Sequence, residues 1–467
     1  GHPANRAKRV VGIRHGRGGD RFAKERDGVG EPTFATGGVT GTFNPAVSSN
    51  LANLTPTLSY DGNDVFLNFA FGYPTGLNGN QQAVADALTR VFNASGIVPL
   101  QWAALDAKGL SQAAGETATG SQQTAFDAMN RFMTMLSDPD AGSRGAEVGP
   151  GFDSQPLAYA GSGKPADAMA AIGGATKAPY LKAPLFAPSW RVWAAGFGGS
   201  ETTDGNAAAG SSSMTSSIYG AAAGADYRLA PGWTAGFALA GGGSNFKVTG
   251  SGDGRSDLFQ AGGFVRHTMG PAYVNASLAY GFQDVTTTRN VGADRLQAKF
   301  DTHTISGRIE GGWRFFTPVL GGLGVTPYAA AQVTTTRLPD YAETALSGSG
   351  AFALAYGSKT ITDPLSELGV RTDKSYALVG GTVLTLRGRA AWVHDFNPNR
   401  SASATFQALP LASFVVNGAA QAGDAALTSA GAEVAWASGW SAGVSFDGTF
   451  SDVTRSYAGK AVVRRAW

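Results

Sequence analysis

The sequence contains no cysteine among its 467 residues, and it has only five histidines. The absence of cysteine excludes disulfide bonds, a thiolate nucleophile and cysteine-ligated zinc. It also suits a chain that crosses an oxidising compartment while unfolded. No phosphate-binding glycine loop, His-Glu-x-x-His helix or EF-hand loop occurs in the sequence. We therefore expect no catalytic site, no metal site, no cofactor and no enzyme activity.

Charge is scarce as well. Charged residues make up 15% of the chain, against about 25% in a typical soluble domain. The 36 Lys and Arg residues nearly balance the 34 Asp and Glu residues, so the global charge gives no reason to expect a nucleic-acid partner. The first residues also lack the apolar core of a signal peptide. For an exported protein, we would expect this chain to be part of a longer one.

Long apolar runs are missing. No stretch approaches the roughly 20 apolar residues that a membrane-spanning helix requires, which argues against a helical membrane protein. Glycine, in contrast, is abundant, at 66 of 467 residues, about twice its ordinary share. The lack of long apolar runs does not argue against a membrane barrel, because barrel strands alternate outward apolar and inward polar residues.

The N-terminal third divides into four segments. Residues 1–30 are basic and are expected to be disordered. Residues 31–75 indicate short strands around an Asp61-Gly-Asn-Asp64 turn. Residues 76–137 change to a helical period. Residues 138–188 are rich in Gly, Pro and Ser and predict a linker, with a short Ala-rich helix from Pro165 to about Gly173.

The second half of the helical segment carries an apolar stripe at helical spacing. Its members are Phe126, Met129, Phe132, Met133 and Leu136. A stripe of Met and aromatic side chains is more often a packing surface than a cofactor site, and we interpret it in that way.

From residue 189 to residue 467 the hydrophobic period becomes two. In the stretch 272–283, Val274, Leu278 and Tyr280 alternate with the polar face of Asn275 and Gln283. The polar faces of later segments carry charge, and we predict that five such residues face a polar lumen: Arg308, Glu310, Arg314, Arg387 and Arg389. Segments of about ten residues with this alternation are typical of transmembrane barrels.

The connections between these segments also alternate. About twelve strands can be counted. Short turns are predicted at Ala230-Pro231-Gly232, Gly270-Pro271 and Ser438-Gly439, and long polar links at 199–215, 286–298, 339–363 and 397–428. Short turns at one end and long loops at the other match the periplasmic and extracellular connections of bacterial barrels. Trp and Tyr residues near the predicted strand ends suit the membrane interfaces.

Several short motifs occur along this region. They include Trp193-Ala-Ala-Gly-Phe-Gly-Gly199, Gly311-Gly-Trp-Arg314, Glu367-Leu-Gly-Val-Arg371 and the closing strand Tyr457–Trp467. Each piece is unspecific alone, but their order and spacing over roughly 275 residues resemble the autotransporter β-domain of type V secretion. The resemblance implies an all-β transmembrane barrel of about 12 antiparallel strands at residues 189–467, with a helix in the pore. It also implies a bacterial outer-membrane protein that exports its N-terminal passenger to the cell surface.

The resemblance assigns roles to three further regions. Residues 165–178 are expected to form the pore helix, whose small residues are Ala166, Ala168, Ala170, Ala171 and Gly173. Residues 31–75 are expected to be the end of a β-helical passenger, of which only this short remnant is present. One face of the last strand is expected to be recognised by the barrel-assembly machinery: Tyr457, Gly459, Ala461, Val463, Arg465 and Trp467.

The expected partners are therefore outer-membrane lipid, the barrel-assembly machinery and the protein's own passenger. Two alternatives remain open at this point. The barrel could act as a surface adhesin through its long loops, or as a porin that needs no pore helix.

Overall fold

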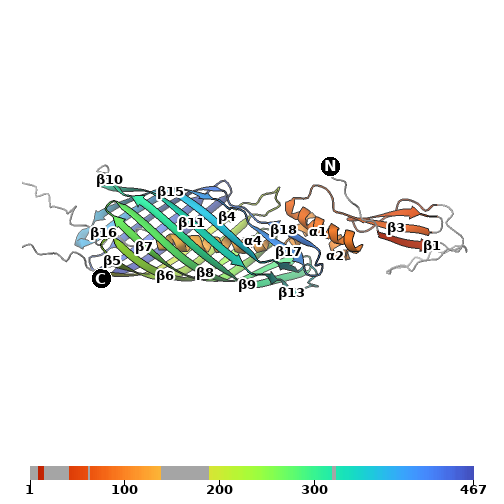
Figure 1. Ribbon diagram of the computed structural model, residues 1–467, viewed down its shortest axis with the longest axis horizontal. Helices are drawn as coiled ribbons and strands as arrows, with labels where there is room; N and C mark the ends of the chain where they lie inside the picture. Colours follow the sequence, from red (N-terminus) through yellow and green to blue (C-terminus); the bar gives the residue numbers. More distant parts are fainter. Residues whose placement is uncertain (1–8, 15–41, 62–63, 138–188, 318–321) are drawn as a thin grey trace, which may run out of the picture.

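The computed structural model describes residues 9–14, 42–61, 64–137, 189–317 and 322–467. Its largest element is one antiparallel sheet of fourteen strands, which closes on itself because β9 pairs with β11. Without the short strands β10 (Phe315–Thr317) and β13 (Thr344–Ser347), twelve strands form the barrel wall (Figure 1). They are β4 (Trp190–Thr203), β5 (Met214–Ala230), β6 (Trp233–Val248), β7 (Gly252–Met269), β8 (Ala272–Val291), β9 (Asp294–Trp313), β11 (Leu323–Leu338), β15 (Lys359–Ala377), β16 (Val383–Asp395), β19 (Asp424–Ala435), β20 (Trp440–Phe450) and β21 (Thr454–Ala466).

The apolar and polar faces of the alternating strands lie on the outside and the inside of the barrel, as expected. On β8, Leu278 is 64% exposed on the outside of the barrel, whereas Asn275 is fully buried inside it. Because successive side chains of a strand point to opposite faces, the apolar residues of each strand form the outer belt and the polar residues line the lumen. The prediction of a twelve-stranded antiparallel barrel is confirmed.

The two ends of the barrel differ. At the turn end, β5–β6, β7–β8 and β19–β20 are joined at Gly232, Gly270 and Gly439, which all adopt positive φ values that favour glycine. These are the three short turns that the sequence predicts. The first barrel strand begins at this end, since Trp190 of β4 lies beside Tyr227. The last barrel strand ends there, since Ala466 of β21 lies beside Arg191.

The loop end holds more regular structure than the sequence predicts. The predicted link at residues 286–298 is wrong: β8 and β9 continue as a paired hairpin to Val291 and Asp294. The Thr-rich sequence there keeps the strand alternation, so the hairpin extends past the apolar belt. Two of the other three long links, 339–363 and 397–428, form a four-stranded sheet across this end. Its strands are β12 (Tyr341–Ala342), β14 (Leu354–Tyr356), β17 (Ser401–Phe406) and β18 (Ser413–Asn417).

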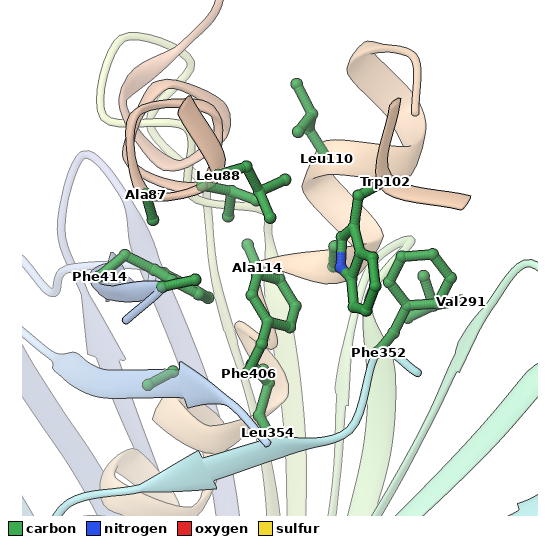
Figure 2. Packing of buried hydrophobic residues seen from close by; sticks show 14 of the residues in the cluster. Ala87, Leu88, Trp102, Leu110, Ala114, Val291, Phe352, Leu354, Phe406 and Phe414 are labelled. Carbon is green, nitrogen blue, oxygen red and sulfur yellow. The ribbon is translucent and has the colours of Figure 1, made fainter. Parts of the chain in front are cut away.

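Three helices cover the small sheet and form what we call the cap. They are α1 (Gly79–Ser95), α2 (Leu100–Ala103) and α3 (Ala107–Ala113). Asn78 begins α1 through a capping box with Gln81. Figure 2 shows Trp102 between Phe352 and Phe406, with ring centroids 5.6 and 6.2 Å away. The cap thus shares one hydrophobic core with the strands at the loop end.

A separate three-stranded sheet lies beyond the cap (Figure 1). It contains β1 (Arg9–Arg14), β2 (Leu54–Tyr60) and β3 (Asp64–Phe71), in the order β1-β3-β2. Strand β1 lies within the basic segment that we expected to be disordered, and its pairing with β3 corrects that expectation for these six residues. All pairs are antiparallel, so the sheet is not itself a rung of a parallel β-helix. A passenger that ends here stays a prediction.

No helix in the described part of the chain has the length and apolarity needed to cross a membrane.

Candidate functional site

The helix that the structure describes inside the barrel is α4 (Thr117–Ser137). It packs against β5–β9 and β11, the wall on one side of the lumen (Figure 1). The sequence predicts a helical segment at residues 76–137 ahead of the barrel, and the resemblance implies a pore helix at residues 165–178. Those residues, with Ala166, Ala168, Ala170, Ala171 and Gly173, lie outside the described residues, and their role stays a prediction.

Large side chains fit on this helix because the wall supplies the small ones. Met129, Phe132 and Met133 are fully buried and pack against four wall alanines, which are Ala222, Ala238, Ala240 and Ala279. For the expected pore helix at residues 165–178, the small residues were expected on the helix itself, whereas for α4 they lie on the wall. The interpretation of the Met and aromatic stripe as a packing surface agrees with these contacts.

Glycines allow the closest approaches. A side chain on Gly120 of α4 would overlap the ring of Phe246 on β6. A side chain on Gly262 of β7 would come within 2.8 Å of Leu136. Both glycines are therefore needed for the distance at which α4 lies from the wall.

Polar contacts hold the remaining face of α4. Asn130 accepts a hydrogen bond of 2.6 Å from Gln332 on β11, and the Ser137 and Ser277 hydroxyls lie 2.9 Å apart. On the opposite side, Arg131 donates to Ser456 on β21 over 3.1 Å. Since these partners come from opposite parts of the wall, they fix the rotation of the helix as well as its position.

Four of the five predicted lumen residues, all except Arg314, line one charged region near the turn end. Arg308 contacts both Glu310 and Glu367, at 2.8 and 2.9 Å, and Arg371 reaches Glu310 at 2.6 Å. Arg389 pairs with Glu367. Glu367 and Arg371 are not among the predicted lumen residues, although both belong to the Glu367-Leu-Gly-Val-Arg371 motif. Their four-residue spacing places both on the inward face of β15 and was the signal for that assignment.

The other two predicted residues form pairs of their own. Arg387 contacts Glu433, which also accepts from Arg464 at 2.8 Å. Arg314 pairs with Asp373 at 2.7 Å but is 41% exposed, since it lies beyond the end of β9 at the rim. Lumenal charge is thus largely paired across neighbouring strands. Cavities of about 100 and 220 Å³ adjoin this region, and both are lined by Thr134 of α4 and by residues of β16 and β19–β21.

The loop end of the lumen is closed around the start of α4. Arg400, which is 2% exposed, contacts Asp363 at 2.8 Å, and its guanidinium lies 4.5 Å from the ring centre of Phe126. Its Nε also donates a hydrogen bond of 3.1 Å to the side-chain oxygen of Gln123 on α4. A loop residue, a barrel strand and the helix therefore meet at one buried guanidinium.

A second buried arginine joins the cap to the barrel. Arg289 of β8 forms a two-pronged contact with Glu343, at 2.6 and 2.7 Å. It also donates to the carbonyl oxygens of Gln112 in α3, at 2.7 Å, and of Phe352, at 2.8 Å. Every group in this cluster has a partner, as a buried charge requires.

The model of the autotransporter β-domain family matches residues 192–447. This match covers more than half of the 467 residues. The chain belongs to the autotransporter family. Its barrel is therefore an outer-membrane translocator domain, located in the bacterial outer membrane, and the family's role implies passenger export.

Solved structures similar to this autotransporter include three translocator units. The translocator domain of NalP from Neisseria meningitidis shares 16% identity at a TM-score of 0.49, covering 64% of this chain and 96% of that one. The β-domain of Bordetella BrkA shares 20% identity at a TM-score of 0.45, covering 59% of this chain and 99% of that one. The transport unit of AIDA-I from Escherichia coli shares 11% identity at a TM-score of 0.41, covering 64% of this chain and 96% of that one. No curated protein sequence matches the chain.

The last strand of this autotransporter presents one face to the outside. On β21, Tyr457 and Val463 are about half exposed, and Trp467 beyond it is 63% exposed. Gly459 and Ala461 lie on the same face, and Arg465 contacts the Trp440 ring at 5.6 Å. This geometry agrees with the predicted alternation, whereas recognition by the assembly machinery stays a prediction.

One sequence match to a hydrolase motif has no hydrolase geometry. Gly439-Trp-Ser-Ala-Gly443 has the Gly-x-Ser-x-Gly spelling, but Gly439 forms a turn and Ser441 lies on β20 beside Arg464. A nucleophile elbow requires a strand-to-helix turn. His394, at the loop end of β16, contacts Asp424 at 2.8 Å instead. Among the described residues, no group of three or more His, Asp or Glu side chains is suited to a metal ion.

Proposed function

We propose that this barrel exports the residues ahead of α4 to the cell surface and afterwards remains closed around α4. The observation that supports the proposal is the path of the chain. Helix α4 lies inside the lumen, while the cap and the β1–β3 sheet, which precede α4 in sequence, lie beyond the loop end (Figure 1). A chain that has passed through a barrel and stopped at α4 would have this arrangement.

The closed sheet makes such a passage compatible with lipid. Every strand of the wall is paired on both sides, so no backbone edge is exposed to the hydrocarbon. The lumen is polar and its charges are paired within the wall, which leaves the wall able to accommodate an unfolded polar segment. We assign no catalytic role to the barrel, and the activity of the complete passenger is separate from it.

Folding of the cap offers a source of direction. Its core buries Leu88, Trp102, Leu110 and Phe352 almost completely. Each large apolar side chain that is buried contributes about 1.5–3 kcal/mol. A cap that forms only after its residues leave the lumen would therefore oppose their return, without any nucleotide-driven step.

The loop end then faces the cell exterior, and the turn end faces the periplasm. In this orientation the C-terminal strand ends on the periplasmic side, with Trp467 exposed near the membrane interface. We further propose that the barrel-assembly machinery recognises the outward face of this strand, from Tyr457 to Trp467.

External protease tests the proposal. A protease-sensitive epitope inserted between Ser48 and Ser49 lies ahead of the β2 strand, and the protein is expressed behind a signal peptide. We expect protease to remove the epitope from intact cells while the barrel stays in the outer-membrane fraction. Cleavage only after the outer membrane is opened would contradict export and favour a porin or a barrel with adhesive loops. A second epitope in the Val379–Gly381 turn serves as the periplasmic control.

A further inference from the structure

The outer wall of the barrel has a basic hollow near the loop end, above the apolar belt. Its volume is about 740 Å³, and the cations that line it are Lys247 on β6, Arg255 on β7 and Arg295 on β9. All three side chains are exposed, and their strand neighbours Phe246, Gly254 and Leu296 are buried. The cations therefore point away from the lumen, into the surroundings of the barrel.

The charge of this basic hollow is unbalanced. Asp253 is the one acidic residue that lines it, which leaves a formal charge of +2 from three cations and one anion. Among the described residues, none of the three cations forms an ion pair within 4 Å. Hydroxyl and amide groups, including those of Thr288 and Gln297, complete the lining. Such a surface is complementary to a phosphate group, which accepts hydrogen bonds and charge together.

The level of the hollow relative to the membrane follows from the strand register. On β7, the outward residues run from the exposed apolar Phe259 through Asp257 to Arg255. With a rise of about 3.3 Å per residue, Arg255 lies about 13 Å along the strand from Phe259 and about 7 Å beyond Asp257. Strand tilt of about 40° reduces the first distance to roughly 10 Å along the membrane normal. The cations thus lie in the headgroup layer, above the hydrocarbon.

A row of three aspartates separates the hollow from the apolar belt. Asp257 pairs with Asp284 across β7 and β8, and Asp284 pairs with Asp301 across β8 and β9. All three are exposed on the outer face. Like charges at this level repel an anion that lies directly above the acyl chains, which is where a glycerophospholipid carries its phosphate. A phosphate carried farther out, on a sugar headgroup, reaches the cations beyond the row.

We propose that the basic hollow binds the phosphate groups of a phosphorylated glycolipid in the outer leaflet. The inference rests on the proposed orientation, in which the loop end faces the exterior. The hollow spans strands β5–β9, which belong to the wall against which α4 packs. A bound glycolipid would therefore bridge and stiffen the part of the barrel that holds the helix.

Binding is tested with the full chain in detergent micelles, titrated with lipopolysaccharide as the phosphorylated glycolipid. The variants are Arg255→Gln and the triple variant Lys247→Gln, Arg255→Gln, Arg295→Gln. Arg455→Gln is the matched control, since Arg455 is an exposed outward arginine near the loop end of β21, outside the hollow. Each cation near an anionic lipid surface contributes about fivefold in affinity. We expect a loss of about fivefold for Arg255→Gln, roughly a hundredfold for the triple variant, and little change for Arg455→Gln.

Three further probes identify the source of the phosphate: dephosphorylated lipopolysaccharide, phosphatidylglycerol and inorganic phosphate. The proposal requires weak binding to all three. The proposal is overturned if phosphatidylglycerol binds as tightly as lipopolysaccharide. It is also overturned if the triple variant keeps the wild-type affinity for lipopolysaccharide, provided that its heat-dependent gel mobility shows a folded barrel. The surface epitope assay on the same triple variant separates the two hypotheses. If export persists while the wild-type barrel binds no glycolipid, only this inference fails; if the epitope is never exposed, the orientation itself fails.

Discussion

Replacing Arg289 with methionine should detach the cap from the barrel without opening the barrel. The substitution removes four contacts of a buried guanidinium, two to the Glu343 carboxylate and one each to the carbonyl oxygens of Gln112 and Phe352. Glu343 then remains buried without a counter-charge. Breaking a buried ion pair on one side costs about 3–5 kcal/mol, because the remaining charge keeps its desolvation penalty.

This loss of stability increases the fraction of molecules in which the cap is open. Since each 1.4 kcal/mol is a factor of ten, the open population of the cap rises roughly a hundredfold to several thousandfold. Hydrogen exchange followed by mass spectrometry reports it directly. We expect amides of α1 and α3 to lose protection by this factor, while amides of β19–β21 on the far side of the barrel keep theirs.

Two companion variants make the reasoning refutable. Arg337→Met removes an exposed arginine of β11 near the same end, and its effect should remain within about 0.5 kcal/mol. The pair Arg289→Met with Glu343→Gln should be less destabilised than Arg289→Met alone, because no unpaired charge stays buried. If α3 exchanges within threefold of the native rate in Arg289→Met, the cluster does not fasten the cap.

Three other outcomes follow from the same structure. Gly120→Leu should destabilise the packing of α4 in the lumen by about 1–3 kcal/mol, because the added side chain overlaps Phe246. Thr134→Leu, on the exposed face of α4, should not destabilise it. The protease sensitivity of α4 is compared between the two variants. Burial raises the pKa of Glu116 from 4.5 to about 7, so the stability of the α4 entrance should fall as pH rises from about 4.5 to 7, by at most about 3 kcal/mol. In Glu116→Gln, thermal unfolding should show no such slope. Removing Trp467 should lower the amount of barrel assembled in cells but not its refolding in detergent, and equal losses in both would assign Trp467 a stability role instead.

Alternation along the strands made the barrel predictable from sequence. The outward Leu278 and the inward Asn275 follow from period two alone, and glycine-containing turns marked three of the strand connections. The lumenal positions of Arg308, Glu310, Arg387 and Arg389 follow in the same way, since they share the polar faces of their strands. These features depend on local sequence, and each segment carries its own signal.

The helix in the lumen and the closed loop end could not be predicted in this way. The fit of α4 depends on Ala222, Ala240 and Gly262, which lie far from it in sequence, so inspection of the helix alone did not reveal it. The same holds for Arg289 and Arg400, whose buried partners come from separate loops. Ion pairs between distant segments leave no periodic pattern, and polar links such as 397–428 therefore resembled simple loops.

The most direct test of the central claim uses the absence of cysteine from the chain. Single cysteines at Leu100, which is 68% exposed on the cap, and at Val379, which is 97% exposed in a turn at the opposite end, are treated in intact cells with a membrane-impermeant maleimide. Export through the barrel predicts rapid labelling of Leu100→Cys, with Val379→Cys labelled only after the outer membrane is opened. Labelling of Val379→Cys with protection of Leu100→Cys would show that the loop end faces the periplasm, and would contradict the proposed export.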